Sequence, residues 1–238
     1  MVIRDWSSDV CSSDLGQRLF LQDSNGVISG SIGGAAGLSK AGGGRLDLAG
    51  ANTYAGLTII SNGTLAVNGS HLGGGQYTVA SGATLGGTGL LDPAIAVLSG
   101  GAVAPGNSIG ALTTSNSFDL DGTLLIELYN GAGPGGLSDL LDVNGLFDLA
   151  NGVVQFVFTG TMTNDYYIFA EYDTLSGSAF LNTLNTPEGY GIDYTFGVGG
   201  NQIALVIPEP STFALLGLGA AVLMGVARRG RGSRKIAG

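Results

Sequence analysis

The side chains with the clearest chemical potential in this sequence are carboxylates near its middle. The candidates are Asp119, Asp121, Glu127, Asp139 and Asp142. Enzymes that cleave polysaccharides place two or three such acids together, and lyases add Lys or Arg. Asp119 and Asp121 alternate with apolar residues, which predicts that both lie on one solvated face of a strand. Asp121-Gly122 and Asp139 are typical of turns. No Lys or Arg lies between Arg45 and Arg228. The sequence therefore predicts a protein that is not an enzyme, with a polysaccharide-acting enzyme as the alternative.

A second candidate is the serine in Gly106-Asn107-Ser108-Ile109-Gly110, which matches the Gly-x-Ser-x-Gly pattern of a nucleophile elbow. That mechanism requires a strand, a sharp turn and a helix, with a histidine base later in the chain. Here a β-prone run follows the serine, and the single histidine, His71, lies upstream among glycines, where we expect an exposed turn. We therefore predict no catalytic residue. With one Cys and one His in the chain we predict no cofactor and no metal site.

Composition and charge narrow the class further. Of 238 residues 44 are Gly, 11% are charged and 44% are hydrophobic, so the chain can build a core despite its glycine content. The net charge is −9, and five of the nine cations lie from Arg228 onward, where there is no acid. An acidic body excludes nucleic acid as the expected partner, because phosphates require Lys and Arg. It is compatible with calcium or a hydrated polysaccharide.

The segment 207–238 has three parts. The motif Pro208, Glu209, Pro210, Ser211 and Thr212 is followed by an uncharged apolar run, 213–227. A basic cluster of Arg228, Arg229, Arg231, Arg234 and Lys235 comes next. As a helix the apolar run measures roughly 22 Å against about 30 Å of hydrocarbon. We predict a short transmembrane helix with arginines at the cytoplasmic face.

This arrangement resembles the PEP-CTERM sorting signal of Gram-negative bacteria. The resemblance implies export, a transient stay in the inner membrane and processing near the Pro-Glu-Pro by an exosortase. It also implies delivery to the cell surface or to the exopolysaccharide matrix. An ordinary membrane anchor or a core helix is the alternative interpretation, but a core helix rarely ends in such a basic cluster.

Residues 4–15 resemble the translation of a sequencing-adapter oligonucleotide, so we interpret 1–15 as an artefactual N-terminus. The only Trp (Trp6) and the only Cys (Cys11) lie in it and receive no role. We expect the natural N-terminus, with its export signal, to lie outside this sequence.

Residues 16–150 alternate short β-prone runs with Gly, Asn, Ser and Asp. A polar residue followed by Gly precedes many runs, and these glycines (63, 82, 100, 122 and 145) recur about every 18 to 23 residues. Glycine supplies the positive φ of a sharp corner, and a corner at this period predicts a β-solenoid. A hairpin-built β-sandwich is the alternative.

Two stretches add a resemblance. Residues 38–58 resemble the autotransporter-associated β-strand repeat. Residues 103–112 resemble the Ala-Pro-Gly-Asn-Ser-Ile-Gly segment common in passenger domains. Over about residues 38–150 the resemblance implies a right-handed parallel β-helix.

Residues 151–206 contain most of the Phe and Tyr, and their strands are expected at 153–158, 166–172, 192–196 and 202–207. Large aromatic strands can cover the open end of a solenoid, so we predict an aromatic β cap, with a sugar-stacking platform as the alternative.

The expected fold class is thus all-β, a solenoid with a cap followed by a short helix. The expected function is that of an exported surface or matrix protein, structural or adhesive and associated with exopolysaccharide. A fragment of a larger adhesin is a further alternative.

Overall fold

The computed structural model describes residues 19–22 and 25–208. It divides into two compact units, Met1–Val206 and Ile207–Gly238, of which the first is described below. All regular secondary structure in the described residues is β-strand, which confirms the all-β class. Within these ranges no helix is long and apolar enough to cross a membrane. The predicted helix 213–227 and the basic cluster lie outside the described residues.

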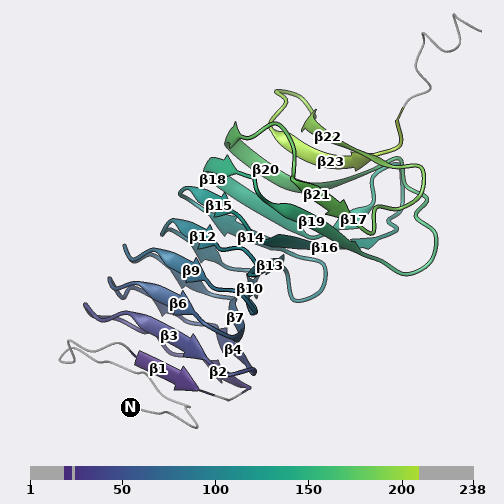
Figure 1. Ribbon diagram of the computed structural model, residues 1–238. Coiled ribbons are helices and arrows are strands. Elements are labelled where there is room, and N and C mark those ends of the chain that lie inside the picture. The colour runs from purple at the N-terminus through teal and green to yellow at the C-terminus, as the bar shows by residue number, and fades with distance from the viewer. Residues whose placement is uncertain (1–18, 23–24, 209–238) are drawn as a thin grey trace, which may run out of the picture. The chain divides into compact units, whose positions relative to one another are not determined.

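Most strands form three ladders of parallel strands, one per face of a solenoid (Figure 1). The first face contains β1 (Leu19–Gln22), β3 (Leu38–Ala41), β6 (Thr58–Ile60), β9 (Tyr77–Val79), β12 (Ile95–Val97) and β15 (Phe118–Leu120). The second contains β2 (Gly26–Ile28), β4 (Arg45–Leu48), β7 (Gly63–Val67), β10 (Ala83–Gly87), β13 (Ala102–Pro105), β16 (Thr123–Tyr129), β19 (Val153–Val157) and β21 (Asn182–Leu184). The third contains β5 (Ala51–Asn52), β8 (Ser70–His71), β11 (Leu90–Leu91) and β14 (Ala111–Thr114).

Two long strands join the third face to the first. β18 (Leu140–Asp148) pairs with β14 and, after an irregularity between Val143 and Leu146, with β15. β20 (Tyr166–Ser176) follows β18 through the same bend. The short β17 (Leu137–Ser138) pairs antiparallel with β16.

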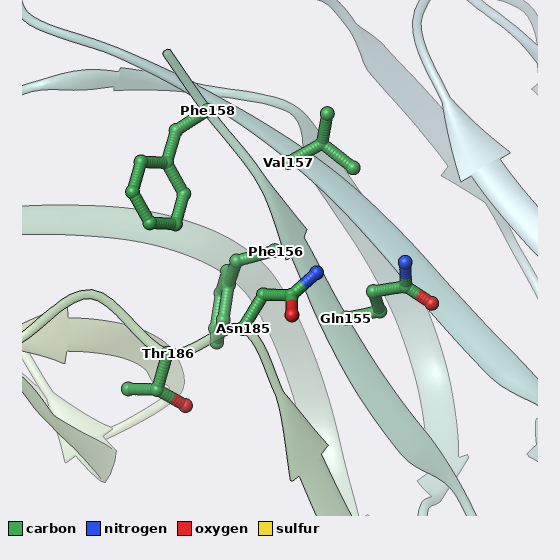
Figure 2. A pocket seen from close by; sticks show the side chains of 6 residues that line it. All are labelled: Gln155, Phe156, Val157, Phe158, Asn185 and Thr186. Carbon is green, nitrogen blue, oxygen red and sulfur yellow. The ribbon is translucent and has the colours of Figure 1, made fainter. Parts of the chain in front are cut away.

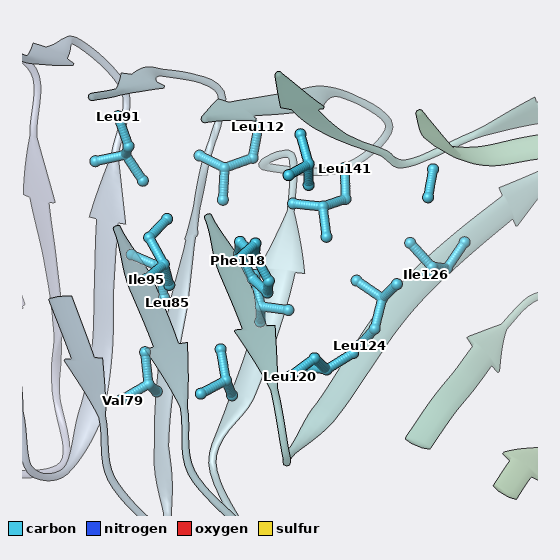
Figure 3. Close-up of a cluster of buried hydrophobic side chains, with 14 of the residues drawn as sticks. Val79, Leu85, Leu91, Ile95, Leu112, Phe118, Leu120, Leu124, Ile126 and Leu141 are labelled. Carbon is cyan, nitrogen blue, oxygen red and sulfur yellow. The ribbon is translucent and has the colours of Figure 1, made fainter. Parts of the chain in front are cut away.

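The register explains why the chain folds this way. On the second face Leu46, Leu65, Leu85, Val103 and Leu124 stand in one column, each the partner of the next. All five are buried, because alternate residues of each strand point into the solenoid. Figure 3 shows apolar side chains from the three faces meeting in one core. The parallel pairing from turn to turn matches the predicted solenoid and differs from the hairpins of a β-sandwich.

Of the five recurring glycines, 63, 82, 100, 122 and 145, all but Gly145 occupy the predicted corner. Gly63, Gly82, Gly100 and Gly122 lie where the chain enters β7, β10, β13 and β16. The first three have positive φ angles of 67°, 79° and 79°. Gly145 instead lies at the bend inside β18, at a different corner of the solenoid. A polar residue followed by Gly occurs at sharp bends of either kind, and Gly145 lies at the bend between the third and first faces.

The last turns carry the aromatic residues. β22 (Gly191–Phe196) and β23 (Gln202–Val206) pair antiparallel with each other, and β23 pairs antiparallel with β20. Phe156 and Phe169 are fully buried and meet edge to face, with ring centroids 5.3 Å apart. These aromatic side chains pack as core beneath the antiparallel strands. These two rings are therefore not part of an exposed sugar-stacking platform.

His71 is buried, contrary to the expected exposed turn. Its ring stacks on Tyr54 at a centroid distance of 3.9 Å. Nε2 lies 2.9 Å from the carbonyl oxygen of Tyr54 and must donate to it, so Nδ1 accepts from the Tyr77 hydroxyl at 2.8 Å. Burial lowers the pKa of His71. The surrounding glycines mislead because they allow neighbouring turns to approach closely, and that approach encloses the ring.

Candidate functional site: a cleft on the second face

On β7, β10 and β13 the second face carries small residues at one outward-facing position. Asp47, Ala66, Gly86 and Ala104 are register partners on β4, β7, β10 and β13. Ala66 is fully buried, although its neighbours Leu65 and Val67 are the residues of β7 that point into the core. Something on the outside of the sheet therefore covers it.

The loop 105–110 lies against the outside of this part of the sheet, where it contacts Asn68 and Gly87. After β13 the chain turns back at Gly106, which has a φ of +88°. Gly106 and Gly87 form an antiparallel bridge, with N–H···O distances of 2.8 and 3.3 Å. A side chain at Gly87 would collide with the carbonyl oxygen of Val67, 2.2 Å from the added Cβ. Glycine at these two positions lets the loop lie flat on the sheet.

Side chains fasten the loop to earlier turns. The Asn107 amide donates to Asn68 Oδ1 at 2.8 Å, and its oxygen accepts from the Arg45 guanidinium. Arg45 also forms an ion pair with Asp47 at 2.9 Å, and Asn68 donates to the same carboxylate at 3.0 Å. The Arg45 side chain is 41% exposed. An ion pair this exposed contributes only about 0–1 kcal/mol to the stability of the folded protein. Its main role is to orient the Arg45 guanidinium toward Asn107.

Asp139 fastens the other end of the loop. It is 2% exposed. Its Oδ1 accepts from the backbone N–H of Gly110 at 3.1 Å, and its Oδ2 accepts from that of Glu127 at 2.9 Å. Burial raises the pKa of Asp139 to about 7; the negative charge of Glu127 adds to this, and the two backbone donors oppose it. The residue that sequence alone placed in an ordinary turn is a buried anchor.

Between the loop and the sheet lies a cleft of about 210 Å³. Gly86, Ala104, Pro105, Leu125 and Val157 give it an apolar floor and wall. Arg45, Thr64, Asn107, Ser108, Glu127 and Asp139 give it polar groups. The cleft combines residues from six strands and two connecting segments, so it exists only in the folded solenoid.

The five candidate acids separate in the structure. Glu127 and Asp139 share the cleft. Asp119 is the register partner of Asp148, and Asp142 that of Glu171, so each faces a like charge on the next strand.

Partial burial and neighbouring acids raise the pKa of both Asp119 and Asp142. Within the described ranges no group of three or more His, Cys, Asp or Glu is placed to hold a metal ion.

The structure also separates Ser108 from His71. Ser108 lines the cleft on the outside of the second face, whereas His71 is buried on the third face with both ring nitrogens occupied. The one histidine of the chain therefore does not lie beside Ser108.

A second hollow, of about 500 Å³, lies where β21 turns away from β19. Figure 2 shows Gln155, Phe156, Val157 and Phe158 of the β19 segment opposite Asn185 and Thr186. Asn185 has a φ of +56°, and Thr186 Oγ1 is buried without a hydrogen-bond partner in the described structure. This hollow has no charged side chain, and sequence analysis did not identify it.

Of the predicted sorting signal, the structure describes Pro208, which follows β23 outside any strand. Glu209, Pro210, Ser211 and Thr212 lie outside the described residues.

Comparison with known proteins gives two family matches. Residues 38–67 match the passenger-associated-transport-repeat model, and residues 206–231 match the PEP-CTERM protein-sorting motif. The chain carries both elements. The passenger-associated-transport repeat runs from β3 to β7, which is more than one turn of the solenoid. It contains Arg45, which lines the cleft, and its ion-pair partner Asp47.

Two curated proteins are similar over part of the chain. The Adhesin BmaC autotransporter of Brucella suis biovar 1 (strain 1330) is 37% identical over 178 residues, 71% of this chain and 5% of that protein. The Extracellular serine protease of Serratia marcescens is 46% identical over 84 residues, 35% of this chain and 8% of that protein. The chain thus spans less than a tenth of the length of either relative.

Proposed function

We propose that this chain is an exported surface protein of a Gram-negative bacterium, with a structural or adhesive role in the extracellular matrix. The observation that supports this most is the combination of a passenger-associated-transport repeat, embedded in a parallel β-solenoid, with a PEP-CTERM sorting motif. The similarity to an adhesin points the same way. We infer right-handed coiling, because parallel crossover connections are almost always right-handed.

Delivery follows from the sorting motif. An exosortase would cut near Pro208–Thr212 after the apolar run 213–227 has held the chain in the inner membrane. The acidic body, free of the basic cluster, would then join the exopolysaccharide. The solenoid suits this role because each turn is stabilised by its neighbours and presents the same faces repeatedly.

Intact-mass analysis of the protein extracted from surface and membrane fractions tests this proposal. The expected surface product ends near Pro208–Thr212, whereas a surface product that retains 213–238 would overturn the processing step. Recovery in the cytoplasmic fraction alone would overturn the exported role itself.

Cleavage of polysaccharide is the second candidate, because Glu127 and Asp139 line one cleft. Against it, both carboxylate oxygens of Asp139 are engaged with backbone N–H groups and the residue is 2% exposed. A glycosidase needs both carboxyl groups within reach of the scissile bond. Release of reducing ends from matrix polysaccharide by the intact protein, abolished by Glu127→Gln, would favour this candidate.

A further inference from the structure

We propose that the cleft between loop 105–110 and the second face binds one uncharged pyranose ring of a matrix polysaccharide. This inference rests on the proposed function and specifies the ligand through which the protein would adhere. The argument follows from the lining, the size and the charge of the cleft.

The residues that line the cleft offer both an apolar surface and polar groups, which is the combination that a sugar ring requires. Ala104, Leu125 and Val157 offer apolar surface, and Val157 is 46% exposed. Thr64, Ser108 and Glu127 offer hydroxyl and carboxylate groups at the same cleft. These three side chains make no hydrogen bond to another described residue. A pyranose has an apolar C–H face and a rim of hydroxyls, which fits one apolar surface with free donors and acceptors around it.

The size restricts the ligand to one ring. Sites for drug-sized ligands measure about 300–1,000 Å³, and this cleft measures about 210 Å³. The loop closes it on one side, and the rest opens along the outside of the sheet. A single unit within a longer polysaccharide can therefore enter while its neighbours stay in solvent.

The charges favour an uncharged sugar. Arg45 is already engaged by Asp47 and Asn107. The remaining exposed charge is the carboxylate of Glu127, with the buried Asp139 beneath it. A uronic acid would meet this negative charge without a free cation, whereas sugar hydroxyls can donate to it.

The site is also organised before binding. Asn107, Gly106 and Gly110 are held by Asn68, Gly87 and Asp139, respectively. A loop fixed at three points loses little freedom when a ligand enters, which improves affinity for a small ligand.

The test is ligand-observed NMR on the full chain with four probes: methyl glucoside, galactoside, mannoside and N-acetylglucosaminide. We expect saturation transfer to at least one, with a Kd of about 1 mM. Ala104→Leu should fill the cleft and weaken binding at least tenfold. Ala102→Leu is the matched control, because Ala102 lies two residues earlier on the same outward face of β13 and outside the cleft. It should leave binding unchanged.

Thr64→Val removes one hydroxyl at nearly constant volume and should weaken binding several-fold even if Ala104→Leu distorts the loop. Absence of saturation transfer from all four probes at about 10 mM would overturn the inference, and so would equal binding by the Ala104 and Ala102 variants. Either result leaves surface delivery intact, because that is measured by fractionation and mass.

Discussion

The Asn107 side chain accepts a hydrogen bond from Arg45, 62 residues earlier in the chain. The contact joins the loop after β13 to the outer surface of β4, three strands away along the second face. It shows that the loop spans several turns of the solenoid and fixes them relative to one another.

Replacing Asn107 with Ala should loosen this loop without unfolding the protein. The bonds to Arg45 and Asn68 are exposed, so we expect a loss of about 0.5–1.5 kcal/mol or less in the free energy of unfolding. Hydrogen exchange at the Gly87 and Gly106 amides should accelerate at least tenfold. Asn151→Ala, which removes a similar exposed bond to Asp121, is the control and should leave both amides unchanged. Unchanged exchange in Asn107→Ala would show that the glycine bridge alone holds the loop.

Asp139 should make stability fall as pH rises from about 4 to about 7. Its folded pKa of about 7 lies above the unfolded value of 3.8, so the folded state binds the proton more tightly. The stabilisation is complete below the unfolded pKa and disappears as pH passes the folded pKa. Its size is on the order of 4 kcal/mol, since the pKa rises from 3.8 to about 7 and one pKa unit corresponds to about 1.4 kcal/mol.

Urea unfolding across this pH range, compared between the protein and Asp139→Asn, isolates the effect. At low pH both side chains are neutral, but the Asn amide nitrogen cannot accept from a backbone N–H as the second carboxyl oxygen of Asp139 does, so the variant should lose about 1–3 kcal/mol there. Because Asn does not titrate, this difference should shrink as pH rises and reverse by about pH 7. A difference that is constant with pH would contradict the assignment.

His71 should titrate below the ordinary histidine range. Burial lowers its pKa, so its contribution to stability is present above the unfolded pKa of about 6.5 and is lost as pH falls below that value and through the lower folded pKa. It is the only histidine in the chain, so its Hε1 signal in proton NMR is unambiguous. We expect a midpoint below 6.5 and nitrogen shifts of the Nε2–H tautomer. A midpoint above 6.5 would show that the ring is accessible to water.

Gly63→Ala and Gly82→Ala separate two reasons for glycine at the corners. Both positions have positive φ, which costs an alanine about 1–2 kcal/mol. A Cβ at Gly63 would also lie 2.4 Å from the carbonyl oxygen of Gly42, whereas a Cβ at Gly82 meets nothing within 4 Å. Thermal unfolding should therefore show a substantially larger loss for Gly63→Ala. Equal losses would mean that neighbouring turns can move apart at no energetic penalty.

The sequence by itself determined the class of fold. Polar-Gly corners such as Gly63, Gly82 and Gly100, with apolar alternation between them, predict a solenoid, because each turn contacts only its neighbours and the same local pattern must recur. The resemblance at residues 38–58 was likewise confirmed by the matched repeat at residues 38–67.

Tertiary structure decided the rest. His71 is buried because its ring contacts Tyr54, 17 residues earlier, as well as Tyr77, six residues later. The glycines around His71 gave no sign that these rings would enclose it. Asp139 looked like a turn residue, yet its carboxylate holds the backbone of Gly110, 29 positions earlier. The cleft depends on small outward residues such as Gly86 and Ala104 coming into register beneath a returning loop. Gly86 and Ala104 become neighbours because the number of residues in the turn between them places them at the same position on adjacent strands. The site therefore forms only when the turns stack.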